Sequence, residues 1–304
     1  HTLYVATTGS DLTGDGSLDK PFATIFAANN SITDASEHNR YTIKVADGTY
    51  DDMEARYSGT TPVGYQGIVC KAWVTYEGNV DHPENVVLKW DGSVGYDTFT
   101  YNGTARMKCL FHILGNKINE GYYPGKRTIR GFKLVAENTR YCIHVETAGY
   151  GLGVDWEITD CLFDWNGVPA DPAKNNSDPP PVIGTGSGHF ENGLIARCKI
   201  NNTAPVNKGF LNHDSAYMYD NARFREGAKI FFDSVDFGGG SVRFRTTHGD
   251  NNVDGYNRCY VHNCTGISTF DYDLSGGSTD VDWRADVKCS DIVNNVFATN
   301  GKLQ

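Results

Sequence analysis

Short runs in which apolar and polar residues alternate recur along the chain and predict strands rather than helices. In one recurring pattern an apolar residue is followed three positions later by a small or apolar residue and, two positions further, by another apolar residue. Ile129, Phe132 and Leu134 form one copy, and the copy at Val261 is incomplete. The copies follow each other in steps of 29, 37, 37, 29 and 31 residues, beginning at Ile129, Ile158, Ile195, Phe232, Val261 and Ile292. Unequal steps indicate strands that repeat and loops that vary in length.

A second series of apolar residues lies between these copies. Ile143 and Val145 alternate with polar neighbours, and the series continues with Phe210, Val242, Phe244 and Phe270. Gly, Asn or Asp bounds each run, as is usual for short strands. Repeats of this size suit a solenoid whose stacked coils bury one continuous core. We therefore predict an all-β chain that forms one parallel β-helix domain over residues 1–304, with a β-sandwich as the weaker alternative.

The N-terminal residues predict a cap on this solenoid. The segments YVATTGSD, DGSLDKPFATI and YTIKVADGTY, all within residues 1–50, resemble the opening of right-handed parallel β-helix proteins of the pectate-lyase-like superfamily. The resemblance implies a first strand, a short capping helix over Pro21–Ile32 and a first coil at Tyr41–Ala46. A cap is needed because an open solenoid end exposes apolar surface and unpaired strand edges. Residues 57–65 and the Pro- and Asn-rich insertion 166–181 are expected to be loops.

Composition narrows the function. The 27 basic and 37 acidic residues give a net charge of −10, which argues against a nucleic-acid partner. No apolar run approaches the ~20 residues that cross a bilayer, so no membrane insertion is expected. The chain begins at His1 without a signal peptide, and we expect a processed fragment. Its eight cysteines form no CxxC pair and several stand in apolar runs, which predicts buried thiols and assembly in a reducing cytosol.

Strand alternation predicts a polar face. If Ile143 and Val145 point into the core, then Cys142, His144 and Glu146 point outward. If Phe210 points inward one register later, Leu211 and His213 point outward, with Asp214 at the strand end. Gly-rich residues 182–188 lie between these strands, and Arg243 and Arg245 follow them. Two coils of about 4.8 Å each would separate His144 from His213 by ~10 Å, over a glycine floor.

This face predicts acid–base chemistry on a glycan. We expect a catalytic group at residues His144, Glu146, His213 and Asp214. Arg243, Arg245 and Tyr217 are expected to bind substrate through paired hydrogen bonds and ring stacking. Each has a plainer interpretation: an exposed His–Glu pair, an Asx turn at Asp214, solvated arginines that pair with nearby Asp residues, and a tyrosine packed between coils.

No cofactor or metal is expected. Asp250, Asn252, Asp254 and Gly255 match the first half of a calcium-binding EF-hand loop, but Val261 stands where the bidentate Glu belongs. A half-match is more often a polar turn. Calcium is therefore only a minor alternative.

The later strands, with IHVE, VIGTGSG and NHDS, resemble β-helix proteins of phage tails. That resemblance implies a tailspike-like polysaccharide depolymerase, a hydrolase or lyase, in a virion assembled in the host cytoplasm. It also implies a homotrimer, other virion proteins and a bacterial surface polysaccharide as partners. Two alternatives stay open: a virion protein that binds glycan without cleaving it, and a secreted bacterial lyase related to pectate lyases.

Overall fold

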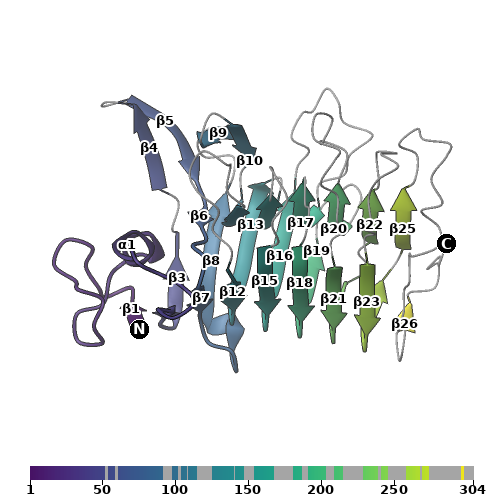
Figure 1. The fold of residues 1–304 in the computed structure, drawn as a ribbon, viewed down its shortest axis with the longest axis horizontal. Coiled ribbons are helices and arrows are strands. Elements are labelled where there is room, and N and C mark those ends of the chain that lie inside the picture. Colours follow the sequence, from purple (N-terminus) through teal and green to yellow (C-terminus); the bar gives the residue numbers. More distant parts are fainter. Residues whose placement is uncertain are drawn as a thin grey trace.

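The structure is a computed structural model in which strands stack one after another along the long axis of the molecule (Figure 1). It describes residues 1–51, 54–58, 61–91, 98–101, 104–107, 109–114, 125–139, 141–146, 154–167, 181–186, 191–202, 209–214, 229–238, 241–245, 258–267, 269–273 and 296–297.

The described strands form three main parallel sheets, each with strands from successive coils. Sheet A contains β1 (Thr2–Val5), β2 (Tyr41–Val45), β7 (Val74–Glu77), β12 (Arg127–Arg130), β15 (Val154–Thr159), β18 (Glu191–Ala196), β21 (Lys229–Asp233) and β23 (Arg258–His262). Sheet B contains β6 (Ile68–Val69), β11 (Phe111–Leu114), β14 (Ile143–Glu146), β17 (Pro181–Gly186), β20 (Gly209–Asp214), β22 (Ser241–Arg245) and β25 (Thr269–Asp273). Sheet C contains β3 (Gly48–Tyr50), β8 (Val86–Asp91), β13 (Lys133–Thr139), β16 (Leu162–Gly167) and β19 (Lys199–Asn202). The short pair β24 (Thr265–Ile267) and β26 (Val296–Phe297) continues sheet C through bridges at Asp236.

The order of these strands makes the chain a right-handed parallel β-helix. From β6 onward each coil runs from sheet B to sheet A, then to sheet C, and back to sheet B. Connections between parallel strands are right-handed in nearly all proteins. The predicted fold class is therefore confirmed.

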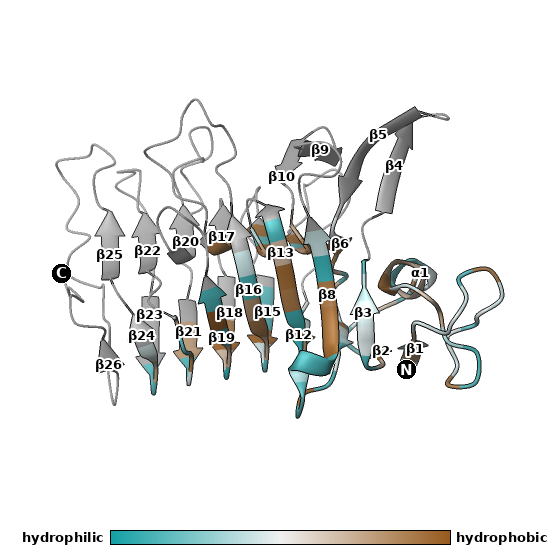
Figure 2. Ribbon diagram, turned by 180° about the vertical axis from the view of Figure 1, so that it is seen from behind, coloured by the Kyte–Doolittle hydropathy of each residue, from teal (hydrophilic) through white to brown (hydrophobic). Residues whose placement is uncertain are grey.

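The recurring apolar pattern lies at the corner between sheets A and C. Its first and last residues are the inward positions of the two strands, and its middle residue fills the corner. In the copy at Ile158, Cys161 and Phe163 all three side chains are buried. The residue before each corner position has a positive φ, from 50° to 75°, at Gly131, Asp160, Arg197, Ser234 and Asn263. This left-handed residue turns the chain sharply, so that two sheets share one core; Figure 2 shows the apolar stretches of β8 and β13 that line it.

A helix caps the N-terminal end as expected, but it is shorter than the predicted helix over Pro21–Ile32. Helix α1 (Ile25–Ser31) begins after Thr24, whose hydroxyl accepts a hydrogen bond from the Ala27 N–H at 3.1 Å. Its Asn29 donates to the Val69 carbonyl at 3.1 Å and accepts from the Tyr76 hydroxyl at 2.6 Å. These bonds fix the helix to β6 and β7. Because Ile25 is fully buried, α1 covers the end of the core.

Two predicted loops differ from the structure. Residues 57–58 and 61–65 belong to an antiparallel pair of strands, β4 (Glu54–Ser58) and β5 (Thr61–Gln66), and β9 (Thr98–Tyr101) pairs likewise with β10 (Thr104–Met107). The ends of the insertion 166–181 are strand, because residues 166 and 167 close β16 and Pro181 opens β17.

A 3-10 turn, η1 (Pro83–Asn85), precedes β8. In the described part of the chain, no helix has the length and apolar character to cross a membrane.

The predicted buried thiols are confirmed for the cysteines whose side chains are described, namely Cys70, Cys109, Cys142, Cys161, Cys198 and Cys264. Burial raises the pKa of Cys109, Cys142 and Cys198 well above the usual value. The Sγ atoms of Cys161 and Cys198 lie close to the carbonyl oxygens two residues earlier, at 3.2 and 3.3 Å. These thiols act as small core side chains.

Candidate functional site

Strand register in sheet B defines two columns of residues, one from each coil. The His144 column consists of Val69, His112, His144, Gly184, Asn212, Arg243 and Asp271. The Glu146 column consists of Leu114, Glu146, Gly186, Asp214, Arg245 and Asp273. Between them runs a column that begins with Ile113 and Val145, both fully buried. Because side chains alternate along a strand, the His144 and Glu146 columns belong to the opposite, outer face of the sheet.

Glu146 and Asp214 share one column, although the sequence predicted for Asp214 only a place at the end of its strand. Gly186 pairs with Glu146 on one side and with Asp214 on the other. At the usual strand spacing, two coils separate the two backbones by about 10 Å. The glycine between them places no side-chain bulk in that interval. Strand register thus places these two residues in line, and their catalytic roles stay predictions.

The predicted position of His213 is wrong. Register places it between Thr185 and Phe244, in the column of the buried Val145, and not in the His144 column. The prediction took Phe210 as the inward residue, but Leu211 pairs with Ile183 and Val242. The register between β20 and β22 shifts at this point, as at a β-bulge, so Phe210 is an extra residue. Asn212 therefore takes the outer place expected for His213.

The expected exposure of Cys142 and His144 is also wrong. Cys142 is fully buried in the core, because it lies at the corner where the chain enters sheet B and both it and Ile143 are enclosed. His144 is 6% exposed. Its ring stacks on Tyr141 with centroids 4.9 Å apart and meets the edge of the buried His112 ring at 5.7 Å. His144 is therefore part of a packed aromatic group rather than a solvent-facing side chain.

The predicted arginines continue the two columns. Arg243 is in register with Asp271, and Arg245 with Asp273, so a carboxylate-bearing residue lies one coil beyond each arginine. The sequence analysis gave Asp271 no place in this column; the alternation in FDYD was the signal that could have placed it there. Tyr217 and the calcium-loop residues 250–255 lie outside the described residues.

One pair of polar residues on sheet A was missed. The Nδ1 atom of His262 lies 2.8 Å from Oδ1 of Asp233, its register partner on β21. A carboxylate on Nδ1 fixes the tautomer and orientation of an imidazole. The signal was present, because both strands end in a polar residue directly after an inward apolar one. The pair lies on the outer face of sheet A, apart from the columns of sheet B.

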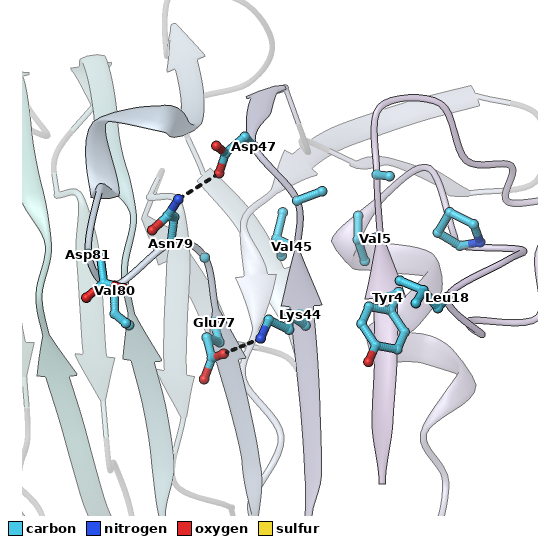
Figure 3. A pocket seen from close by; sticks show the side chains of 14 residues that line it. Tyr4, Val5, Leu18, Lys44, Val45, Asp47, Glu77, Asn79, Val80 and Asp81 are labelled. Carbon is cyan, nitrogen blue, oxygen red and sulfur yellow. Dashed lines mark hydrogen bonds and ion pairs between the residues drawn. The ribbon is translucent and has the colours of Figure 1, made fainter.

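A groove of about 450 Å³ lies near the N-terminal end of sheet A (Figure 3). Val5 and Val45 line its base where β1 and β2 end, and Leu18 lies on one side with Asn79–Asp81 on the other. Tyr4, Lys44 and Glu77 are register partners on three neighbouring strands and form its lower rim. Sequence reasoning missed this groove because its residues come from three coils and two loops.

Hydrogen bonds hold the groove in shape. Asp47 accepts from the side-chain amides of Asn79 at 3.0 Å and Asn85 at 3.2 Å, which anchors the loop after β7. Glu77 pairs with Lys44 at 3.4 Å and accepts from Nε of Arg130 at 2.9 Å. These partners come from different coils, so the stacking of the coils sets the geometry of the rim.

No metal site emerges from the described residues, among which no group of three or more His, Cys, Asp or Glu side chains is placed to hold an ion. The described side chains of the groove that carry charge are one lysine and three acids. The columns of sheet B supply acidic and basic residues along a line. Acid–base chemistry or hydrogen bonding to a polymer would suit such an arrangement.

Comparisons with known proteins do not assign a function to the chain. No protein-family model and no curated protein sequence matches the chain. Among solved structures it is similar to a pectin methylesterase from carrot, at 11% identity over 98% of this chain and 88% of that chain, with a TM-score of 0.43. A rhamnogalacturonan lyase is similar at 12% identity over 91% of this chain and 83% of that one, with a TM-score of 0.27. At these identities and TM-scores the function has to be argued from the site.

Proposed function

We propose that the protein binds a bacterial surface polysaccharide along the outer face of sheet B and cleaves it between Glu146 and Asp214. The observation that carries this proposal is the Glu146 column, in which Gly186 separates two carboxylate-bearing residues. A polymer laid along the sheet would meet the two carboxylates on either side of one bond. Paired carboxylates supply both the acid and the base that glycoside hydrolysis requires.

The spacing favours one type of hydrolysis. Retaining enzymes hold their carboxyl groups about 5–5.5 Å apart, whereas inverting enzymes leave about 6.5–9.5 Å for a water molecule. Backbones about 10 Å apart fit the wider arrangement better. In this mechanism one carboxylic acid protonates the leaving oxygen, and the other carboxylate removes a proton from the attacking water. His144 is buried and His213 lies in the inward column, so the proposed reaction uses the two carboxylates alone.

The rest of the two columns would position the polymer. Asn212 on β20 would offer hydrogen-bond donors, and Arg243 and Arg245 would offer them on β22, one coil further along. We further propose that the protein is tailspike-like, assembles as a homotrimer with other virion proteins and is located in a phage tail. Its buried thiols support assembly in a reducing compartment.

A non-catalytic glycan-binding protein is the second candidate. The burial of His144 removes one of the expected catalytic groups, and Arg245 stands in register between Asp214 and Asp273. Neighbouring opposite charges in one column favour a surface that binds hydroxyl groups without transferring protons. Polysaccharide would then bind to the same face and remain intact.

The test is incubation with a panel of purified capsular and wall polysaccharides, followed by measurement of polymer size and ultraviolet absorbance. Shortened product without new absorbance is expected and indicates hydrolysis. Shortened product that absorbs in the ultraviolet indicates elimination, as for a secreted lyase, and overturns the hydrolytic mechanism. Bound but unshortened polymer supports the second candidate.

A further inference from the structure

The groove at the N-terminal end of sheet A combines apolar side chains with a polar rim. The side chains of Leu18 and Val80, on opposite sides of it, are large apolar groups with exposed fractions of 70% and 41%. Val5 and Val45, at its base, are buried. An apolar hollow bordered by a few fixed polar groups is the usual form of a small-ligand site.

The rim offers donors and acceptors side by side. The Lys44 ammonium and the Tyr4 hydroxyl can donate, and the Glu77 carboxylate can accept; the three residues stand in one register row about 4.8 Å apart per strand. Glu77 stays in place because Lys44 and Arg130 hold it from both sides. A ligand that reaches this rim therefore meets groups already oriented by the fold.

Charge restricts the ligand. Among the described residues of the lining, Asp47, Glu77 and Asp81 are acidic and Lys44 is the one cation. Asp47 is bound by two neutral amides, which leave its charge uncompensated. An acidic ligand would be repelled, whereas an uncharged or basic one would not.

We propose that this groove binds a single non-acidic sugar residue, neutral or amino-substituted, of the polysaccharide that the protein recognises. A sugar ring has an apolar face that matches Leu18, Val80 and the valine base, and hydroxyl groups that both donate and accept at the rim. The choice of a sugar among hydroxylated ligands rests on the proposed function. The groove is separate from the sheet B columns, so it would hold the polymer without taking part in cleavage and would add avidity.

Methyl NMR of the full chain tests the proposal with glucose, galactose, N-acetylglucosamine and glucosamine, and with glucuronic acid as the acidic comparison. The methyl signals of Leu18 and Val80 are expected to shift with at least one non-acidic sugar and not with glucuronic acid. The Leu12 methyl groups serve as an internal control, because Leu12 is 96% exposed on the same loop but does not line the groove. Absence of any shift at Leu18 and Val80, or equal shifts at Leu12, would overturn the proposal.

Paired variants separate the groove from general surface effects. Leu18→Ser and Lys44→Met should weaken sugar binding at least tenfold, whereas Leu12→Ser and Lys20→Met should not change it. Equal weakening in both pairs would contradict the site. Polymer cleavage without sugar shifts in the groove would refute this inference alone, and shifts in the groove without cleavage would refute the proposed hydrolysis alone.

Discussion

Glu146 and Asp214 stand in one column of sheet B, two coils apart, with Gly186 in register between them. The relationship follows from the winding of the chain, which brings two residues 68 positions apart in the sequence to places separated by a single strand. Stacked coils thus place residues from distant parts of the sequence in one row, at the fixed spacing of the strands.

Removing either carboxylate should abolish cleavage while binding persists. Glu146→Gln and Asp214→Asn keep the size of each side chain but cannot shuttle a proton, so we expect cleavage rates to fall about 10²–10⁴-fold. Rates are measured as new reducing ends, and binding as co-sedimentation with the polymer. Glu37→Gln and Asp19→Asn, at exposed N-terminal positions, are the matched controls. Full activity in both site variants would show that the reaction lies elsewhere.

Filling the glycine position should block the polymer without harming the fold. Gly186→Leu adds bulk in the column between Glu146 and Asp214, and a strand tolerates leucine better than glycine. We expect cleavage to fall at least tenfold with an unchanged or higher melting temperature. Thr42→Leu, which places the same side chain at a partly exposed position of sheet A, should leave cleavage unchanged. Unimpaired cleavage by Gly186→Leu would mean that the polymer does not cross this column.

The fold was predictable because its signals are local and repeated. Alternation marks each strand, and the corner pattern seen from Ile158 to Phe163 recurs in successive repeats of the sequence. The corner itself was not predictable, because the positive φ falls on residues as different as Asp160, Arg197 and Ser234. Tertiary packing imposes that conformation, against the intrinsic preference of these side chains.

The site was predictable only in part, for two physical reasons. The four candidate catalytic residues could be named from the alternation, but their columns could not, because alternation does not decide which of the adjacent Phe210 and Leu211 takes the inward place. The regular register with β17 gives that place to Leu211, so His213 falls in the column of Val145 and Asp214 in that of Glu146. Burial at an outer position depends on what covers the sheet, and alternation carries no information on that; His144 was therefore expected to be exposed. The N-terminal groove depends on how loops pack against the strands, and strand alternation does not predict loop packing either.

The pair of Asp160 and Arg197 should make stability depend on pH. Arg197 donates from Nε to Oδ1 at 2.6 Å and from Nη2 to Oδ2 at 2.8 Å. Partial burial acts to raise the pKa of Asp160, but hydrogen bonds from Arg197 and Thr159 outweigh it and hold the pKa below its usual value. A lowered pKa stabilises the fold above the unfolded-state value of about 3.9, and this contribution is lost as the pH falls through the folded-state pKa.

Asp160→Asn should therefore cost stability at neutral pH and little in acid. Solvent screens the exposed guanidinium, so we expect a loss of about 0.5–1 kcal/mol at neutral pH. The measurement is urea unfolding at a series of pH values, with Asp19→Asn as the control. A difference between Asp160→Asn and the unmodified protein that stays constant down to the most acid pH would contradict the assignment of the charge effect to this pair.

The buried thiols should resist modification in the folded protein. Reaction requires an accessible thiolate, and burial both encloses these side chains and raises the pKa of Cys109, Cys142 and Cys198. Maleimide followed by peptide mass spectrometry should leave the six buried cysteines unlabelled in the native protein and label all of them in guanidinium. Asp19→Cys, at an exposed position, supplies a positive control for labelling. Rapid native labelling at Cys142 would contradict the packing where the chain enters sheet B, and at Cys161 the packing where it enters sheet C, because both thiols are fully enclosed.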